Sequence, residues 1–309
     1  MKQNYLAAIS LCAILIVSGC SKENTPEEGK ISISEITASG EVPQAMQDAT
    51  RTTLDGYSVN WSTGDAVGCM ETSQPASNNK FILSKGAGTK YGTFVVDPAS
   101  TPLTTGTWIA YYPHSATRYT SSKKYRMVNQ AQIDETTNHV AKTDWLVSDP
   151  VKIGTSSLGA DFKMKHAFAL VEFKVKLKRP AASAYDEPRL AQCVLATQDE
   201  SRIFAQQIYF DNGGQMQFDY TALSTAIVRD DKPLLTVTND VTAWLLTRQS
   251  SVQPLKVTVF FEYGVITSAS TLFTPTSILE PGKKYKIGLE VELNEDNPNA
   301  STLTIVSRS

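Results

Sequence analysis

The fold is decided by the stretch Phe162–Arg179, which reads FKMKHAFALVEFKVKLKR. Its large side chains occupy even positions from Phe162 to Leu170, whereas apolar side chains occupy odd positions from Ala167 to Leu177. Because side chains on a β-strand alternate between two faces, the buried face must change near residues 167–170. A strand that leaves one core and enters another has this pattern, and so does a β-bulge. We therefore place a boundary between two β-domains near residue 160.

The rest of the chain also consists of strand-like runs. Short segments rich in Val, Ile, Thr, Phe and Tyr are separated by Gly, Pro, Asn and Asp, which is typical of β-structure. A hairpin is predicted from Ile208–Phe210 to Met216–Phe218, because the Asn212-Gly213 pair accepts the positive φ angles of a tight turn. No window has a sustained helical period, so the sequence predicts an all-β protein. The clearest runs are Tyr57–Trp61, Tyr91–Val96, Thr107–Tyr112, Trp145–Ser148, Leu255–Tyr263 and Lys284–Leu293.

The N-terminus has the pattern of a bacterial lipoprotein signal. An apolar run from Leu6 to Val17 ends at Val17-Ser18-Gly19-Cys20. The run is shorter than the roughly 20 apolar residues of a transmembrane helix, and small residues before the cysteine suit a signal peptidase. The Cys20 thiol would carry diacylglycerol, and after cleavage Cys20 would be the acylated N-terminus, with fatty acids such as palmitate. The alternative is an ordinary secretory leader with a chance cysteine. We expect residues 1–19 to be removed and the protein to be exported and tethered by lipid.

Composition and cysteine content set further limits. The 309 residues carry a net charge of −2 and have a pI near 6.0, which argues against a nucleic-acid partner. Hydrophobic residues make up 41% of the chain, enough to form cores. With Cys12 in the signal and Cys20 acylated, Cys69 and Cys193 remain. They could form a disulfide in an oxidising compartment, or each could be a buried thiol.

The sequence predicts no catalytic, metal or cofactor site. His114, His139 and His166 are scattered, without the spacing of a metalloprotease, and no serine-hydrolase motif occurs. His166 falls on an inward position, where a hydrogen-bonded structural histidine is expected. Trp108, Trp145 and Trp244 lie in strand-like runs and are expected in the core. Exposure of two tryptophans in one shallow cleft would instead favour sugar binding.

Several segments, taken in order, resemble the fimbrillin family, the type V pilins of Bacteroidales. The resemblance runs from end to end and implies two β-sandwich domains like transthyretin, at residues 52–160 and 161–293. It also implies a lipidated leash and propeptide with the first strand at 20–51, and a tail at 294–309. The segments that carry the resemblance are the lipid-attachment motif ending at Cys20, Arg51–Leu54, Val59–Asp65, Ala110–Pro113, Phe162–Ala169 and Leu279–Tyr285.

The resemblance implies a route of assembly. Family members travel as lipoproteins to the outer membrane, and an arginine-specific protease then separates the first strand from the rest. Arg51 is the first arginine of this chain and the next is Arg118, so the Arg51–Thr52 bond is the expected cleavage site. The strand lost would be Ile31–Ile36, with Ile31 and Ile33 leaving two pockets. The alternative is that Arg51 is a plain surface residue.

The tail offers a replacement strand. A polar tether at residues 294–299 leads to the β-prone segment Ser301–Ser307, in which Leu303 and Ile305 share a face. These two side chains could fill the vacated pockets of a neighbouring subunit, by strand addition. Alternatively, the tail completes the chain's own sheet. The sequence thus predicts a structural fimbrial subunit at the cell surface, whose partners are other fimbrial subunits. The alternatives are a lipid-retaining anchor, a tip adhesin or a glycan-binding surface lipoprotein.

Overall fold

A computed structural model describes residues 31–40, 60–74, 77–127, 130–181 and 187–309 of the chain. These described residues form one compact unit. Within the described ranges almost all regular structure is β, and the helices are the short α1 (Asn138–Thr143) and η2 (Pro298–Ala300). The predicted all-β class is confirmed. Among these residues no helix combines the length and the apolar character needed to span a membrane.

The first sheet has eight strands in the order β2-β3-β4-β1-β10-β8-β5-β9. Because β2 also pairs with β5, all of these strands except β9 close into a ring. A closed ring leaves no free strand edges among its members. It encloses a core that includes Trp61, Phe81, Phe94 and Phe162. The strands are β1 (Glu35–Gly40), β2 (Ala66–Glu71), β3 (Asn79–Lys85), β4 (Tyr91–Val96), β5 (Gly106–Tyr112), β8 (Leu146–Ser148), β9 (Val151–Ile153) and β10 (Asp161–His166).

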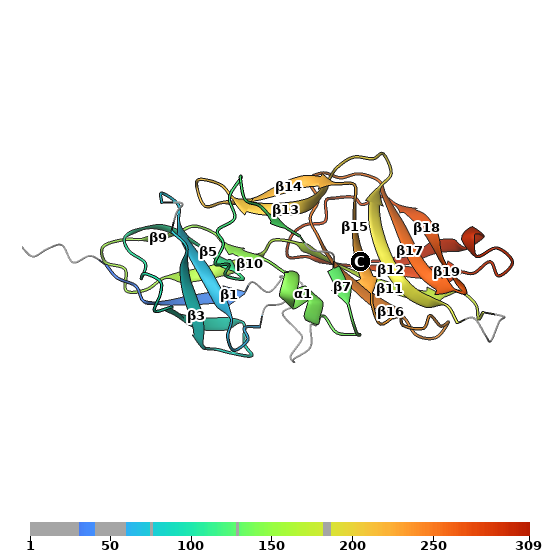
Figure 1. Cartoon of the computed structure of the whole chain (residues 1–309), viewed down its shortest axis with the longest axis horizontal. Helices are drawn as coiled ribbons and strands as arrows, with labels where there is room; N and C mark the ends of the chain where they lie inside the picture. Colours follow the sequence, from blue (N-terminus) through green and yellow to red (C-terminus); the bar gives the residue numbers. More distant parts are fainter. Residues whose placement is uncertain (1–30, 41–59, 75–76, 128–129, 182–186) are drawn as a thin grey trace, which may run out of the picture. The chain divides into compact units, whose positions relative to one another are not determined.

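The first strand, β1 (labelled in Figure 1), is a member of this ring and pairs with β4 on one side and β10 on the other. It runs antiparallel to β4, with Ala38 opposite Gly92, and parallel to β10, with Ala38 opposite Phe162. The regular strand starts at Glu35 and ends at Gly40, further along the chain than the expected Ile31–Ile36. Ile33 is joined to Leu103 by an isolated bridge, and both Ile33 and Ile36 are buried. Two buried residues three positions apart break the alternation, so the regular strand begins only after Ile33.

Two further sheets enclose the second core. A 4-stranded sheet has the order β16-β11-β19-β20, and a 5-stranded sheet has the order β18-β17-β12-β15-β7. Between them lie 28 buried hydrophobic residues, Phe173, Leu195, Val257 and Phe261 among them. The strands are β7 (Gln130–Gln132), β11 (Ala169–Leu177), β12 (Arg189–Thr197), β15 (Ser224–Arg229), β16 (Val241–Thr247), β17 (Leu255–Tyr263), β18 (Val265–Phe273), β19 (Lys284–Glu292) and β20 (Thr302–Arg308).

The change of buried face in Phe162–Arg179 is a change of sheet. Strand β10 belongs to the 8-stranded sheet and β11 to the 4-stranded sheet, so the chain passes between them at Ala167–Phe168. Phe162 and Met164 enter the first core, whereas Val171 and Phe173 enter the second. Strand β10 therefore lies with the first sheet, although a boundary at residue 160 would assign it to the second half. The division into two domains remains a prediction.

A small third sheet has the order β14-β13-β6, with β6 (Tyr125–Arg126), β13 (Phe204–Phe210) and β14 (Met216–Ala222). Strands β13 and β14 pair antiparallel with Phe210 opposite Met216, which confirms the predicted hairpin. A third hydrophobic cluster lies beneath this sheet and combines Tyr111 and Trp145 with Phe168, Phe210 and Leu246.

One edge of the 4-stranded sheet is closed by side chains. Edge strand β16 presents the backbone groups of Thr242, Trp244 and Leu246 away from β11. The Gln130 side chain donates from Nε2 to the Leu246 carbonyl and accepts from the Leu246 N–H at Oε1, both at 2.7 Å. Gln132 likewise donates to the Thr242 carbonyl at 3.1 Å and accepts from the Trp244 N–H at 3.1 Å. Glutamine amides thus take the place of a neighbouring strand.

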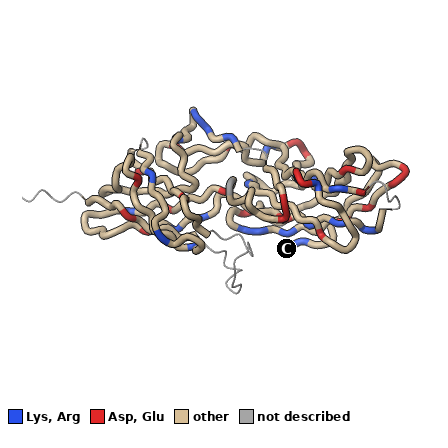
Figure 2. The backbone as a smooth tube through the Cα atoms, turned by 60° about the horizontal axis from the view of Figure 1, so that its bottom comes forward, with Lys and Arg blue, Asp and Glu red and all other residues tan. Residues whose placement is uncertain are grey.

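Charged residues of both signs occur along the described chain (Figure 2). On the outer face of β11, Lys176 and Lys178 pair with Glu290 and Glu292 of β19 at 3.3 and 2.9 Å. These ion pairs are solvent-exposed, so each contributes little to stability. They do favour the observed register of β11 against β19, because opposite charges face each other across the two strands.

Candidate functional site

Strand β1 is hydrogen-bonded along both flanks. Beyond its ladders with β4 and β10, Ile33 exchanges two backbone hydrogen bonds with Leu103, at 2.8 and 2.9 Å. The Thr37 hydroxyl donates to Asp161 Oδ1 at 2.7 Å. Because each flank of β1 is paired, its removal would leave the facing edges of β4 and β10 unpaired. We call the space between these two strands the β1 seat.

Trp61 fixes one end of the β1 seat. Its indole Nε1–H donates to the Ala38 carbonyl at 3.2 Å and to the Lys90 carbonyl at 3.1 Å. The side chain is 1% exposed and meets Phe94 and Tyr112 edge-on, with ring centroids 5.0 and 5.5 Å away. An aromatic side chain is thus held against β1 through the carbonyl of Ala38.

The turn after Trp61 holds the indole in place. The Asp65 carboxylate accepts from the Ser62 N–H at 2.6 Å and from the Tyr112 hydroxyl at 3.0 Å. Gly64 has a φ of +92°, in the left-handed region that favours glycine. Burial raises the pKa of Tyr112, and the neighbouring Asp65 raises it further, so the hydroxyl stays protonated and can donate. The segment Trp61–Asp65 is therefore a structural support for the β1 seat.

The inward side chains of β1 become smaller along the strand. Ile36, Ala38 and Gly40 are its buried positions. Opposite Ala38, Gly92 has no room for a side chain, since an added Cβ would lie 2.9 Å from Trp61 Cδ1 and 2.6 Å from Phe94 Cε2. The β1 seat is therefore wide at Ile36 and narrow at Ala38.

The C-terminal tail lies in another sheet. Strand β20 pairs antiparallel with β19, with Leu303 opposite Val291 and Ile305 opposite Leu289. Leu303 is 6% exposed, whereas Ile305 is half-buried and Val306 is 49% exposed. In the described chain β20 has a ladder on one side alone, with β19. As an edge strand it can leave the sheet by breaking a single ladder.

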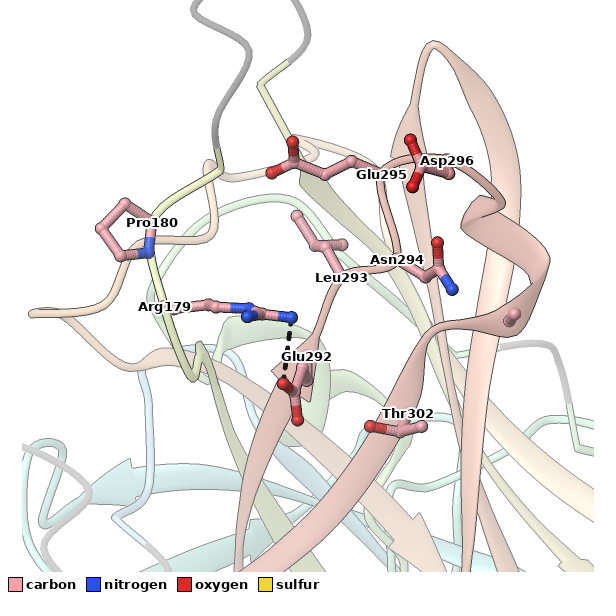
Figure 3. Close-up of a pocket in the computed structure, with 9 residues that line it drawn as sticks. Arg179, Pro180, Glu292, Leu293, Asn294, Glu295, Asp296 and Thr302 are labelled. Carbon is pink, nitrogen blue, oxygen red and sulfur yellow. Dashed lines mark ion pairs between the residues drawn. The ribbon is translucent and has the colours of Figure 1, made fainter.

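A polar hollow of about 630 Å³ lies beside the start of the tail (Figure 3). Arg179 and Glu292 form an ion pair across it at 3.1 Å, and Thr302 of β20 lines it. Its carboxylates are solvent-accessible side chains, and among the described residues no cluster of His, Cys, Asp and Glu is suited to a metal ion. The hollow marks the place where the tether joins the tail.

The predicted site residues fall in three places. Cys20, Arg51 and Thr52 lie outside the described residues. Ile31 packs against the first core and Ile33 lies within it. Leu303 lies in the second core, with Ile305 packed against it. The structure of the single chain therefore does not bring the two pairs together, and the tail pairs with β19 of its own chain. The donor role of Leu303 and Ile305 stays a prediction.

The cysteines, histidines and tryptophans have structural positions. Cys69 and Cys193 are free, buried thiols in different cores, so they do not form a disulfide. Inward-facing His166 lies 2.5 Å from an Asp144 carboxylate oxygen through Nδ1, and His139 Nε2 lies 2.8 Å from the Trp244 carbonyl. Trp108 and Trp145 are 3% exposed, and Trp244 is half-buried. No tryptophan side chain is exposed in a cleft.

Sequence reasoning did not identify Trp61, Ala38 and Gly92 as parts of one site. The sequence shows the polar residues Ser62–Asp65 after Trp61, but it does not show which group accepts the indole N–H. Ala38 and Gly92 have weak strand propensity and gave no signal of their own. Their small size has meaning only beside the indole.

The fold and these sites define an all-β protein whose first and last strands lie in different sheets. The chain belongs to the fimbrillin-like family, which matches residues 50–306. The resemblance seen in the sequence is thereby confirmed.

Several solved structures are similar to this chain. A candidate cell adhesion protein from Bacteroides ovatus is similar at 16% identity with a TM-score of 0.51, over 91% of this chain and 97% of the other. One from Bacteroides uniformis has 13% identity and a TM-score of 0.49, over 88% and 97% of the two chains. A fimbrial protein from Bacteroides ovatus has 14% identity and a TM-score of 0.38, over 90% of this chain and 54% of the other. Among curated proteins no sequence matches the chain.

Proposed function

We propose that this chain is a structural subunit of a surface fimbrium that serves adhesion, and that it polymerises by strand exchange. Membership of the fimbrillin-like family supports a fimbrial adhesion subunit. The observation that carries the strand-exchange step is the position of β1 within a closed ring. A terminal strand inside a ring is a removable part whose loss opens two backbone edges at once.

Loss of β1 would create a strong acceptor. The departure of Ile36 and Ala38 uncovers the core around Phe94 and Phe162. Burial of each aliphatic side chain is worth roughly 1.5–3 kcal/mol, and the unpaired edges of β4 and β10 add a demand for hydrogen bonds. A strand from another subunit can satisfy both demands. The tail is the natural donor, since β20 is held by one ladder.

Processing after Arg51 would release β1 without breaking another described element. Strand β1 ends at Gly40, and the next described residue is Asn60. Arg51 falls between them, so a cut at the Arg51–Thr52 bond separates β1 from Trp61 and everything that follows. In this proposal an arginine-specific protease makes the cut. Export as an outer-membrane lipoprotein, through acylation of Cys20, delivers the chain to the surface first.

The N-terminus of assembled subunits tests this proposal. Surface polymers would be sheared from the bacterium, and the N-terminus of their subunits determined by mass spectrometry. We expect subunits that begin at Thr52. Subunits that begin at an acylated Cys20 would overturn the proposed function as a subunit that polymerises by strand exchange. They would instead support a lipid-retaining anchor, because a chain that keeps β1 has a closed ring and no acceptor.

Substitutions in the tail test the donor. Replacing Ile305 by Asn should shorten or abolish polymers, because an apolar side chain is lost from the donor strand. The matched control replaces Thr304, which is exposed on the same strand, by Asn and should polymerise normally. Deletion of residues 298–309 should have the effect of the first variant. Unchanged polymer length after that deletion would exclude the tail as donor.

The other candidate functions have less support. A glycan-binding surface would call for exposed tryptophans, and Trp61, Trp108 and Trp145 are buried while Trp244 is half-buried. A structural, non-enzymatic role agrees with the family. We therefore retain the anchor or tip subunit as the second candidate, because the closed ring that includes β1 would end a polymer.

A further inference from the structure

We propose that the β1 seat selects the incoming strand by side-chain size, and that it accepts the tail of a second copy of this chain in one register. In this register Ile305 takes the position of Ile36, Ser307 that of Ala38, and Ser309 that of Gly40. The inference rests on the proposed strand exchange and adds a residue-by-residue alignment to it. Trp61 is the positioning residue that enforces the alignment.

The narrow part of the β1 seat is bounded by large aromatic residues. At the level of Ala38, Phe162 is the register partner on β10, and the Trp61 indole lies within hydrogen-bond distance of the Ala38 carbonyl. Gly92 faces Ala38 from β4, and its missing side chain is the space that Trp61 and Phe94 fill. A side chain much larger than alanine would have to displace one of these rings. Overpacking of this kind is destabilising in a close-packed core.

The tail has the same gradient of size in the same direction. Its alternate residues Leu303, Ile305, Ser307 and Ser309 pass from large to small toward the C-terminus. Those of β1 do the same from Ile36 through Ala38 to Gly40. A donor that runs in the direction of β1 therefore places Ile305 in the wide part and serines in the narrow part. A donor strand that ran in the opposite direction would place Ile305 or Leu303 beside Trp61.

Shifted registers fit less well. A shift by two that puts Leu303 at Ile36 would place Ile305 in the narrow site at Ala38. The opposite shift would place Ser307 at Ile36 and leave a cavity in the wide site. A shift by one turns the other face inward, so that Val306 or Arg308 would meet Trp61 and Phe162. Cavities and overpacking both cost stability, and the proposed register avoids both at the positions of Ile36, Ala38 and Gly40.

The outer face of the β1 seat agrees with the same register. There Arg308 takes the position of Ser39, whose neighbour across β4 is Tyr91. A hollow of about 450 Å³ adjoins this position and is lined by Tyr91, Asp161 and Lys85. The exposed ring of Tyr91 and the Asp161 carboxylate can contact the Arg308 guanidinium group. In the single chain this group lies over the Phe273 ring, with Cζ 5.3 Å from the ring centroid.

Disulfide trapping in the polymer tests the register. Thr37 faces Thr93 across β1 and β4, at a pair whose backbone groups do not bond each other, so its side chains lie close. In the proposed register Val306 takes the position of Thr37. Polymers of the T93C/V306C variant should therefore form disulfides between subunits on mild oxidation. The matched control is T93C/T304C, whose cysteines would lie two residues out of register and beyond the reach of a disulfide.

The outcomes separate the register from strand exchange itself. Disulfides in T93C/V306C at about tenfold the control level or more would support the register. Disulfides mainly in T93C/T304C would overturn the register and leave strand exchange standing. Normal polymers with disulfides in neither variant would overturn the register. If the subunits of those polymers still contained β1, the proposed function would be overturned as well.

A size substitution tests the role of Trp61. Ser307→Ile would place a large side chain in the narrow site, and we expect polymer yield to fall by about tenfold to hundredfold. The control Val306→Ile adds one methylene on the outward face and should polymerise normally. Normal polymerisation of Ser307→Ile would overturn selection by size. Partial rescue of Ser307→Ile by Trp61→Phe would assign the exclusion to the indole.

Discussion

The glutamine side chains that close the edge of β16 allow a quantitative prediction. Gln130 is 5% exposed, and its amide makes two hydrogen bonds of 2.7 Å to the backbone of Leu246. Gln130→Leu retains the approximate size of the side chain and removes both hydrogen bonds. The Leu246 N–H and carbonyl are then left buried without these partners.

The expected cost follows from these two groups. An unsatisfied buried backbone group costs about 1–3 kcal/mol, and the apolar leucine returns part of this through burial. We therefore expect Gln130→Leu to lower the free energy of unfolding by about 2–4 kcal/mol. The matched control is Gln206→Leu, because Gln206 accepts one hydrogen bond from Thr221 at the surface. The control should change stability by less than about 0.5 kcal/mol.

Urea denaturation and amide hydrogen exchange measure the two consequences. The urea midpoint of Gln130→Leu should fall with an unchanged slope. The Leu246 amide should exchange faster in the native state, since its acceptor is lost. A loss below about 0.5 kcal/mol, with an unchanged exchange rate at Leu246, would refute the idea that Gln130 replaces a strand at this edge.

Three further predictions concern other buried polar groups. Trp61→Phe keeps an aromatic ring and loses the hydrogen-bond donor to the Ala38 and Lys90 carbonyls, so the free energy of unfolding should fall by about 1–3 kcal/mol. An unchanged urea midpoint would contradict a stabilising role for these hydrogen bonds. Arg229→Met removes a fully buried guanidinium that pairs with Glu135 and Asp231 at 2.7 Å. Thermal denaturation should show that the free energy of unfolding falls by about 2–4 kcal/mol. Equal or higher stability would mean that the partners do not offset the cost of burying this charge. Burial raises the pKa of Cys193 from 9.0 to about 12 and that of Tyr111 from 10.0 to about 12. Both groups stay neutral in the folded chain and ionise at lower pH in the unfolded chain, so stability should be full below about pH 9 and decline between pH 9 and 12. Urea midpoints that do not change over this range would contradict that assignment.

Much of the fold could be predicted because it depends on alternation along single strands. The bounds of β4 and β17 are those expected, Tyr91–Val96 and Leu255–Tyr263. The change of face in Phe162–Arg179 is likewise a property of one segment, and it corresponds to the passage from β10 to β11. Where the buried face of a strand follows the alternation of its own apolar residues, the sequence is sufficient to predict the strand.

The rest depends on contacts between distant segments. Gln130 and Gln132 look like loop residues in the sequence, because nothing local shows that β16 lacks a neighbour. Ala38 and Gly40 belong to β1 although small residues favour strands weakly. The small size of Ala38 is explained by Trp61, which follows it by 23 positions. When a residue far away in the sequence limits the size of a side chain, no periodic pattern in the sequence reveals it.

Control of strand edges connects these features. A protein that assembles by strand addition must offer one acceptor and protect its other edges, since any free edge can pair with any strand. In the first sheet, ring closure protects the edges of every strand except β9 for as long as β1 is present. In the 4-stranded sheet, Gln130 and Gln132 occupy the free side of β16, so β20 is the edge that can exchange. If these glutamines have this role, Gln130→Leu should yield laterally aggregated material in addition to its loss of stability, whereas Ser307→Ile should reduce polymer without aggregation. The same defect in both variants would mean that edge protection and strand selection are not separate properties of this chain.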